Sequence, residues 1–231
     1  MKVVLFDIDG TLVLTGGAGA RAMTRAFADV FGVRDGLSGV SLAGRTDTWI
    51  LSEMARQHGF EYDEPTFQRF HQTYLDYLTH EVQQRGTGRK TVLPGVRELL
   101  DVLAVRDDVS LALLTGNFSG GARLKLEHFD LWRYFPCGAF AEDAPERNAL
   151  LATALARIAA NDGPVVAAAD AIVVGDTPHD VNVALAGGAR SLAVATGSFD
   201  VQALRETGAD VVLEDLSDLR MALSVLGLAD A

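Results

Sequence analysis

The strongest constraint on the fold of this 231-residue chain is a short apolar run that recurs along it and ends each time in polar residues. Five such runs occur, at residues 3–6, 109–114, 171–174, 191–195 and 210–213. Short and nearly continuous apolar runs are typical of strands that are buried on both faces of a parallel sheet. The chain is therefore predicted to build a parallel sheet in which each strand ends in a polar loop.

Stretches in which apolar residues recur at helical spacing separate these runs. They lie near residues 95–105, 119–129, 146–160, 179–187, 200–207 and 216–226. The alternation of strand and helix favours an α/β fold with a Rossmann-like parallel sheet. Ligands of such open sheets bind outside the carboxyl ends of the strands, so we expect the polar loops to meet at one site.

Residues 15–92 interrupt this alternation. They contain few strand signals and three segments of helical periodicity, near residues 18–32, 46–58 and 64–85. We predict an inserted helical domain over residues 15–92 and a catalytic core made of residues 1–14 and 93–231. The glycine-rich stretches at residues 15–19 and 86–88 flank the insertion, and they suit either the hinges of a lid or simple turns.

The composition excludes several classes of partner. The 20 lysines and arginines against 31 aspartates and glutamates give a net charge of −11, which disfavours binding to nucleic acid or to an anionic membrane. No apolar run approaches the roughly 18 residues that a membrane span requires. The single cysteine, Cys137, can form no intrachain disulfide. That suits a reducing compartment, so we expect a cytoplasmic location.

The first apolar run ends in the most informative polar cluster, which reads Asp7-Ile8-Asp9-Gly10-Thr11. Two carboxylates that lie two residues apart in an extended chain point to the same side, and two anions held so close require a cation or a shared proton. One carboxylate can attack phosphorus while the other carries a proton. Gly10 allows a ligand to approach the backbone closely, and Thr11 adds a hydroxyl.

Two further clusters complete a candidate phosphate site. Thr115, Gly116 and Asn117 follow the second run and offer a hydroxyl and backbone N–H groups to phosphoryl oxygens. Asp176 and Asp180 follow the third run and bring two more carboxylates. Mg²⁺ prefers one or two carboxylates together with water and phosphate oxygens, so Mg²⁺ is the expected cofactor, and it would let an acidic protein bind an anionic phosphate.

Residues 6–12, 113–117 and 174–180, in this order, resemble the first, second and fourth motifs of the haloacid dehalogenase superfamily. The resemblance covers nearly the whole chain, and the helical insertion after the first motif is similar to the α-helical cap of the family. The most similar subgroup is that of the phosphoglycolate-phosphatase-like hydrolases. The founding dehalogenases lack an acid at the position of Asp9, so its presence favours phosphoryl transfer over cleavage of a carbon–halogen bond.

The resemblance implies a role for each motif residue. Asp7 would be the nucleophile and a metal ligand, and Asp9 would be the general acid and base, with its backbone carbonyl on the metal. Thr115 would donate to a phosphoryl oxygen. Asp176 would bind Mg²⁺ directly, and Asp180 would bind it through water or support a residue that does.

One departure from the family pattern concerns its third motif, a lysine that precedes the fourth motif. Here the stretch reads Glu142-Asp143-Ala144-Pro145-Glu146-Arg147-Asn148, and the lysine position corresponds to Ala144. Arg147 lies about one helical turn further on and can bring its guanidinium to the same anion. Lys125, in the predicted helix after the second motif, is a rival substitute, and a third possibility is that the site has lost this cation.

Arg45 is the candidate cap residue. In Gly44-Arg45-Thr46-Asp47 it stands at the start of a predicted helix, where it could bind a carboxylate or a second phosphate of the substrate. Alternatively, this segment is a capping turn with an exposed arginine.

The leading hypothesis is a Mg²⁺-dependent phosphatase that hydrolyses a small phosphorylated metabolite through an aspartyl-phosphate. The alternatives are a phosphomutase similar to β-phosphoglucomutase, and a protein that binds phosphate or Mg²⁺ without turnover. A monomer or a homodimer is expected.

Overall fold

The computed structural model describes residues 1–144, 146–161 and 163–229. Its centre is a six-stranded sheet in which all neighbouring strands are parallel, in the order β5-β4-β1-β6-β7-β8. The strands are β1 (Lys2–Phe6), β4 (Val109–Leu114), β5 (Gly138–Ala139), β6 (Ala171–Gly175), β7 (Arg190–Val194) and β8 (Val211–Leu213). The predicted α/β fold with a Rossmann-like sheet is thereby confirmed.

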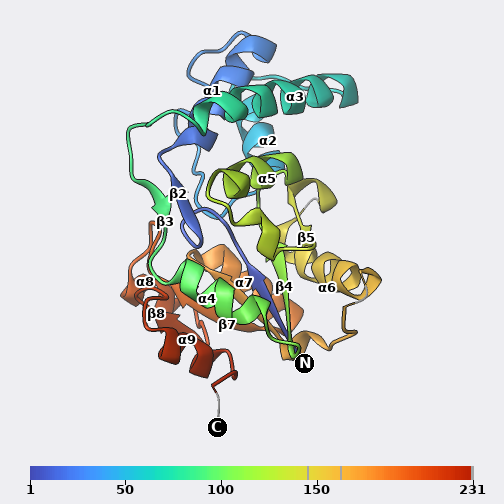
Figure 1. Cartoon of the computed structure of the whole chain (residues 1–231). Helices are drawn as coiled ribbons and strands as arrows, with labels where there is room; N and C mark the ends of the chain where they lie inside the picture. Colours follow the sequence, from blue (N-terminus) through green and yellow to red (C-terminus); the bar gives the residue numbers. More distant parts are fainter. Residues whose placement is uncertain (145, 162, 230–231) are drawn as a thin grey trace.

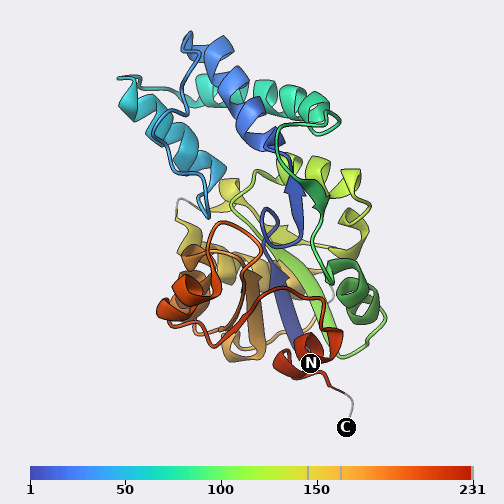
Figure 2. The same cartoon turned by 90° about the vertical axis from the view of Figure 1, so that its left-hand side faces the viewer.

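Helices cover both faces of this sheet (Figures 1 and 2). They are α4 (Val96–Ala104), α5 (Ser119–His128), α6 (Leu150–Ala160), α7 (Pro178–Gly187), α8 (Val201–Glu206) and α9 (Leu219–Val225). Short 3₁₀ helices lie at Trp132–Tyr134, Ala141–Asp143, Arg147–Ala149 and Ala168–Asp170. The helices α4 to α9 match predicted segments, with ends that differ by a few residues.

The hydrophobic core is divided by the sheet into two clusters because successive side chains of a strand point to opposite faces. Val4 and Phe6 of β1 pack on one face with apolar residues of α4, α5 and α9. Val3 and Leu5 pack on the other face with residues of α6 and α7. The central strand is thus apolar on both sides, which accounts for its continuous apolar run in the sequence.

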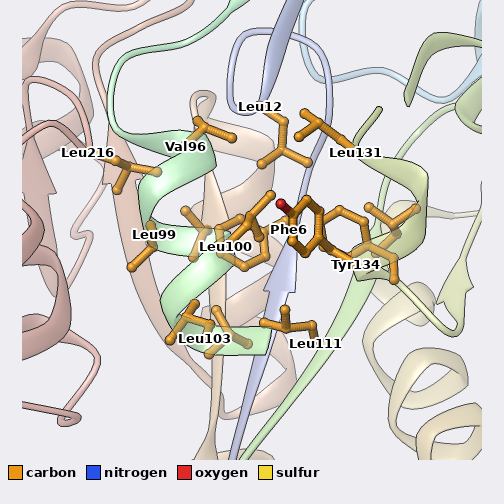
Figure 3. Close-up of a cluster of buried hydrophobic side chains, with 14 of the residues drawn as sticks. Phe6, Leu12, Val96, Leu99, Leu100, Leu103, Leu111, Leu131, Tyr134 and Leu216 are labelled. Atoms are coloured by element: carbon orange, nitrogen blue, oxygen red, sulfur yellow. The ribbon is translucent and has the colours of Figure 1, made fainter. Parts of the chain in front are cut away.

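Helix α4 illustrates the packing. Its buried residues Val96, Leu99, Leu100 and Leu103 recur at three- and four-residue spacing and meet Phe6 of the central strand (Figure 3). Removing each such side chain from water contributes about 1.5–3 kcal/mol before the cost of ordering the chain. The core therefore holds β1 rigidly, together with the acidic residues that follow it.

Residues 16–89 form a separate cluster of helices beyond the carboxyl edge of the sheet (Figures 1 and 2). It contains α1 (Ala18–Phe31), α2 (Asp47–Gln57) and α3 (Glu64–Glu81), all predicted from periodicity. Their buried residues, Phe27, Met54, Phe70 and Tyr74 among them, form a hydrophobic cluster that includes few residues of the sheet domain. The division into a core and a cap at residues 15–92 stays a prediction.

Two short strands, which the sequence analysis does not predict, lie beside the glycine-rich stretches that were expected to form hinges or turns. The antiparallel strands β2 (Val13–Thr15) and β3 (Lys90–Val92) pair with each other and join the helical segment to the sheet. Each strand has three residues, and Thr15, Lys90 and Thr91 break the apolar pattern, so the sequence pattern predicts neither strand. It misses β5 for a similar reason, since that strand has two residues.

Candidate active site

A cavity of about 610 Å³ lies between the carboxyl edge of the sheet and the helical segment. Loops after β1, β4, β6 and β7 line it on one side, and α1, α2 and α3 contribute on the other. Predicted site residues on its wall are Asp7, Asp9, Gly10, Arg45, Gly116, Asn117, Arg147 and Asp176. Polar loops that are distant in sequence thus meet, as expected for an open parallel sheet.

Three buried carboxylates lie together at the carboxyl edge of the sheet, and two of them, Asp7 and Asp176, line the cavity. Asp7 follows β1, Asp176 follows β6 and Asp180 lies in the first turn of α7, and carboxylate oxygens of all three lie within 4.8 Å of one another. The side chains are almost completely buried. The backbone N–H of Asp7 donates to the carbonyl of Val174 at 2.9 Å, so Asp7 is held in register with β6.

Burial makes ionisation of Asp7 and Asp176 unfavourable. The pKa of Asp176 is raised to about 9. Loss of hydration on burial is the largest cause, and repulsion from the carboxylates of Asp180 and Asp7 adds to it. Burial also raises the pKa of Asp7 to about 7, although the positive charge of Arg147 opposes the rise. A cation placed among these groups would restore the ionised state.

The backbone around Asp176 leaves room only for this carboxylate. A Cβ atom on Gly197 would lie 1.7 Å from Asp176 Oδ2, and one on Gly10 would lie 2.3 Å from the same oxygen. Thr11 donates from Oγ1 to Asp176 Oδ1 at 3.1 Å. Two glycines and one hydroxyl therefore hold the carboxylate in place.

Asp180 is oriented by the helix that carries it. Its Oδ2 accepts from the backbone N–H of Thr177 at 3.0 Å and from the Thr177 hydroxyl at 2.8 Å, which closes a capping box at the start of α7. While Oδ2 caps the helix, Oδ1 pairs with Arg147. The carboxylates of Asp7, Asp176 and Asp180 form an all-oxygen donor set that suits Mg²⁺.

The second acid of the first motif, Asp9, is not part of this group of three carboxylates. Its side chain is 43% exposed, and its Oδ2 accepts from Lys125 Nζ at 2.5 Å and from Asn117 Nδ2 at 2.9 Å. The carboxylate thus turns away from the three clustered acids and toward α5. A metal contact of Asp9, through its backbone carbonyl, stays a prediction.

Both cations considered as substitutes for the third-motif lysine lie in the site. Arg147 Nη2 is 3.1 Å from Asp7 Oδ1 and also bonds Asp180, while its Nη1 donates to the carbonyl of Gly44 at 2.9 Å. Ala144, at the position of the family lysine, lies in the hydrophobic cluster on the face of the sheet that α6 and α7 cover. The neighbouring Pro145 lies outside the described residues.

The remaining predicted residues divide into two groups. Gly116, Asn117 and Arg45 line the cavity, and the guanidinium of Arg45 lies 4.3 Å from the ring centre of Trp49. Thr11 and Thr115 are buried and are not among the residues that line the cavity, and contact of either with a substrate stays a prediction. The Thr115 side chain lies near enough to Asp7 to lower the pKa of that carboxyl against the effect of burial, and the Thr115 hydroxyl accepts from Asn117 Nδ2 at 2.8 Å.

Several cavity residues were not assigned to the site from the sequence. Asp47 and Tyr74 reach the cavity from α2 and α3, and Thr196 reaches it from the loop after β7. Thr196 donates from Oγ1 to the carbonyl of Gly10 at 2.5 Å. Thr196 directly follows the fourth apolar run, so its position at the end of a predicted strand could have placed it in the site. No local sequence pattern places Asp47 or Tyr74 there.

The amino-acid sequence matches a known protein family over most of its length. The sequence model of the family described as haloacid dehalogenase-like hydrolase matches residues 4–194. The chain belongs to the haloacid dehalogenase-like hydrolase family. The match begins in β1, spans the helical segment and ends in β7, so it includes most of the loops that meet in the cavity.

Solved structures share the fold of this haloacid dehalogenase-like hydrolase over nearly its whole length. CbbY from Rhodobacter sphaeroides in complex with phosphate has a TM-score of 0.71 at 19% identity, covering 95% of this chain and 96% of that one. A predicted phosphoglycolate phosphatase from Haemophilus somnus has a TM-score of 0.69 at 20% identity, with coverage of 97% and 98%.

A candidate beta-phosphoglucomutase from Thermotoga maritima has a TM-score of 0.62 at 22% identity, with coverage of 98% and 100%. At these identities the likeness concerns the fold alone. No curated protein sequence matches the chain. Among the described residues, none of the helices combines the length and the apolar character needed to cross a bilayer.

Proposed function

We propose that this haloacid dehalogenase-like hydrolase is a Mg²⁺-dependent phosphatase that acts on a small phosphorylated metabolite. The observation that carries the proposal is the juxtaposition of three buried carboxylates with the Arg147 guanidinium, where Asp7, Asp176 and Arg147 line the cavity. A phosphoryl group needs a nucleophile, positive charge around its oxygens and exclusion of bulk water, and this part of the cavity offers each of them.

In this proposal an oxygen of Asp7 attacks phosphorus, a bond forms between that oxygen and phosphorus, and the bond to the leaving oxygen breaks. Asp7, Asp176 and Asp180, with the backbone carbonyl of Asp9, would hold Mg²⁺, which when bound supplies positive charge to the phosphoryl oxygens. Arg147 neutralises part of the negative charge of Asp7 and keeps its carboxylate oriented.

Asp9 would carry the proton in both halves of the reaction. It gives a proton to the leaving oxygen as the first ester bond breaks, and it takes a proton from the water that then attacks the phosphorus of the aspartyl-phosphate. That second attack returns Asp7 to a free carboxylate and releases inorganic phosphate.

A small substrate suits this site because helices α1, α2 and α3 cover it. Lys125, Tyr74 and Asp47 are buried lining residues of the cavity, and Asp7 is itself buried, so a folded macromolecule has little access to Asp7. One cysteine and the negative charge of the chain are compatible with a cytoplasmic metabolic enzyme.

The second candidate is a phosphomutase, which passes the phosphoryl group from Asp7 to a sugar hydroxyl instead of water. The fold shared with a candidate beta-phosphoglucomutase favours keeping it. A mutase would show a long-lived phosphorylated Asp7 and a dependence on a sugar bisphosphate.

The test is release of inorganic phosphate from p-nitrophenyl phosphate and a panel of small phosphomonoesters, with Mg²⁺ or with EDTA. We expect turnover that requires Mg²⁺ and is lost in Asp7→Asn, which keeps the shape of the side chain but removes the nucleophilic carboxylate. An unchanged rate in Asp7→Asn would refute the proposed nucleophile. Binding of Mg²⁺ without turnover of any ester would support the alternative of a protein that binds phosphate or Mg²⁺ without catalysis.

A further inference from the structure

Lys125 is a buried ammonium group that the phosphoryl-transfer scheme above does not use. Its side chain is 5% exposed, and it lies in α5 with Nζ 2.5 Å from Asp9 Oδ2 and 2.5 Å from Asn117 Oδ1. Arg147 already supplies the cation beside Asp7 and Asp180. The structure therefore holds two cations on two different acids.

We propose that Lys125 is a positioning residue that sets the orientation of Asp9, and that it does so together with Asn117. This inference rests on the proposed function, because it assigns Lys125 a part in the same reaction. It differs from the role of the third-motif lysine, which in this chain falls to Arg147.

The pattern of donors around Asp9 supports this assignment. Lys125 Nζ and Asn117 Nδ2 both donate to Oδ2, and Asn117 Oδ1 in turn accepts from Lys125 Nζ. The three groups form a closed triangle of hydrogen bonds that fixes the plane of the carboxyl group. Among the described residues, no donor is bonded to Asp9 Oδ1, so this oxygen remains for the substrate.

Such an arrangement decides which oxygen can carry the proton. With Oδ2 accepting two hydrogen bonds, the acid form of Asp9 carries its proton on Oδ1. As the bond between phosphorus and the leaving oxygen breaks, that proton passes from Oδ1 to the leaving oxygen, and Asp9 becomes a carboxylate. The proton taken later from water returns to Oδ1.

The surroundings of Lys125 also tie Asp9 to the helical segment. Burial disfavours the charged ammonium, but the carboxylates of Asp9 and Asp47 outweigh it and raise the pKa of Lys125. Asp47 belongs to α2, and Nζ also lies close to Gly19 of α1, where a Cβ would be 3.3 Å away. The ammonium therefore sits at the junction between the sheet edge and the helices that cover it.

Dependence on the leaving group tests the proposal. Esters of poor leaving groups need a proton from Asp9, whereas 2,4-dinitrophenyl phosphate does not. We expect Lys125→Met to lower kcat/KM for an alkyl phosphate by about 100-fold or more while changing that for 2,4-dinitrophenyl phosphate by less than about fivefold. Asp9→Asn should show the same selective loss.

Arg123→Met is the matched control, because Arg123 lies on the exposed side of the same helix and pairs only with Glu127 among the described residues. It should leave both rates unchanged. An equal loss on both esters in Lys125→Met, or no loss on either, would overturn the proposal, since a general structural role moves both rates together.

A second variant covers the case in which Lys125→Met does not fold. Asn117→Ala removes the other donor to Asp9 Oδ2 and should produce the same leaving-group dependence with a smaller amplitude. Lys125→Cys in a Cys137→Ala background, alkylated with 2-bromoethylamine, restores an ammonium group of similar length and should recover alkyl phosphate turnover. Absence of recovery would count against the proposal.

The two proposals fail in different ways. If the wild-type protein releases no phosphate from any ester, the proposed function fails. If it turns over both classes of ester in a manner that needs Asp7, but the Lys125 variants show no selectivity, only the role of Lys125 fails.

Discussion

Asp47 shows at the scale of one residue how a charge can be buried where two parts of the chain meet. Its backbone N–H donates to the carbonyl of Gly116 at 2.7 Å, and its Oδ2 accepts from the backbone N–H of Phe118 at 2.8 Å. The side chain from α2 thereby bonds the residue that precedes α5. Burial, partly opposed by Lys125, raises the pKa of Asp47 to about 6.

This raised pKa predicts that ionisation of Asp47 lowers the free energy of unfolding by an amount that depends on pH. The unfolded chain releases the Asp47 proton near its ordinary pKa of 3.8, whereas the folded chain keeps it up to a pKa of about 6. The folded state therefore binds more protons between these two pKa values, and the free energy of unfolding falls as the pH rises through this range. Above the folded pKa the cost is fully present.

Asp47→Asn removes this titration but keeps an oxygen that accepts from Phe118. We expect the variant to gain about 1–3 kcal/mol in the free energy of unfolding, relative to wild type, as the pH rises from about 4 to about 7. Urea unfolding of both proteins across this range measures the difference. Parallel pH profiles would show that Asp47 is ionised in the folded protein at low cost.

Gly197 provides a steric test of the metal site at the same scale. A Cβ there would lie 1.7 Å from Asp176 Oδ2, and no positive φ adds strain at this position. We expect Gly197→Ala to push the Asp176 carboxylate aside and to weaken Mg²⁺ binding about 10- to 100-fold, as is usual when the support of a metal ligand is lost.

Titration of activity with Mg²⁺ would show this as a higher half-saturating concentration. Urea unfolding without Mg²⁺ serves as the control. The midpoint of Gly197→Ala should stay close to that of the wild type, which would show that the effect is on the metal site and not on the fold. An unchanged Mg²⁺ dependence would mean that Asp176 does not bind the ion.

Contacts between several elements form the joint that connects the sheet to the helical segment. Arg21 of α1 donates from Nη1 to the carbonyl of Gly16 at 2.6 Å and from Nε to Glu81 of α3 at 2.7 Å. Gly86 packs against the same stretch, since a Cβ on it would lie 2.4 Å from the Gly16 carbonyl oxygen. One side chain thus connects both helices to the strand that leads out of the sheet.

Arg21→Met should loosen this joint. We expect the amide protons of α1 and α3 to exchange faster by an amount that corresponds to about 1–2 kcal/mol, while those of β1, β4 and β6 keep their protection. Hydrogen–deuterium exchange with mass spectrometry measures both sets in one experiment. Arg56→Met, which breaks an exposed ion pair with Glu53 on α2, is the control and should have little effect. Equal acceleration in the sheet would argue against a local role.

At the scale of the whole molecule, binding of Mg²⁺ should stabilise the fold. The ion would bring together three buried carboxylates that follow β1, follow β6 and lie in α7, and no such cluster forms in the unfolded chain. At a Mg²⁺ concentration about 100 times the dissociation constant the gain is about 2.7 kcal/mol, which raises the Tm of a chain of this size by roughly 5–10 °C.

Thermal unfolding with Mg²⁺ or EDTA measures this gain. Asp176→Asn should remove most of the Mg²⁺ effect without preventing folding, because it also relieves the repulsion among the three carboxylates. A Tm that does not respond to millimolar Mg²⁺ would contradict the proposed metal site.

Local patterns carried most of the prediction of the fold. The runs that form β1, β4 and β6 are apolar and bounded by polar residues, so burial of both faces leaves a clear trace in the sequence. Strands β2, β3 and β5 have two or three residues and depend on pairing with distant partners, so their sequences carry little trace of it.

Strand periodicity, helix periodicity and motif spacing are local properties, so they predict the parallel sheet, the helices and the set of acids at the ends of the strands. The pairing of the charges depends instead on contacts between distant parts of the chain. Arg147 lies beside Asp7 and Asp180, while Lys125 lies beside Asp9, and Asp47 arrives from the helical segment. The positions of Lys125 and Asp47 depend on the packing of α5 and α2 at the sheet edge, and that of Arg147 depends on the short helix before α6. This packing brings together residues that are far apart in the chain and that no local spacing relates.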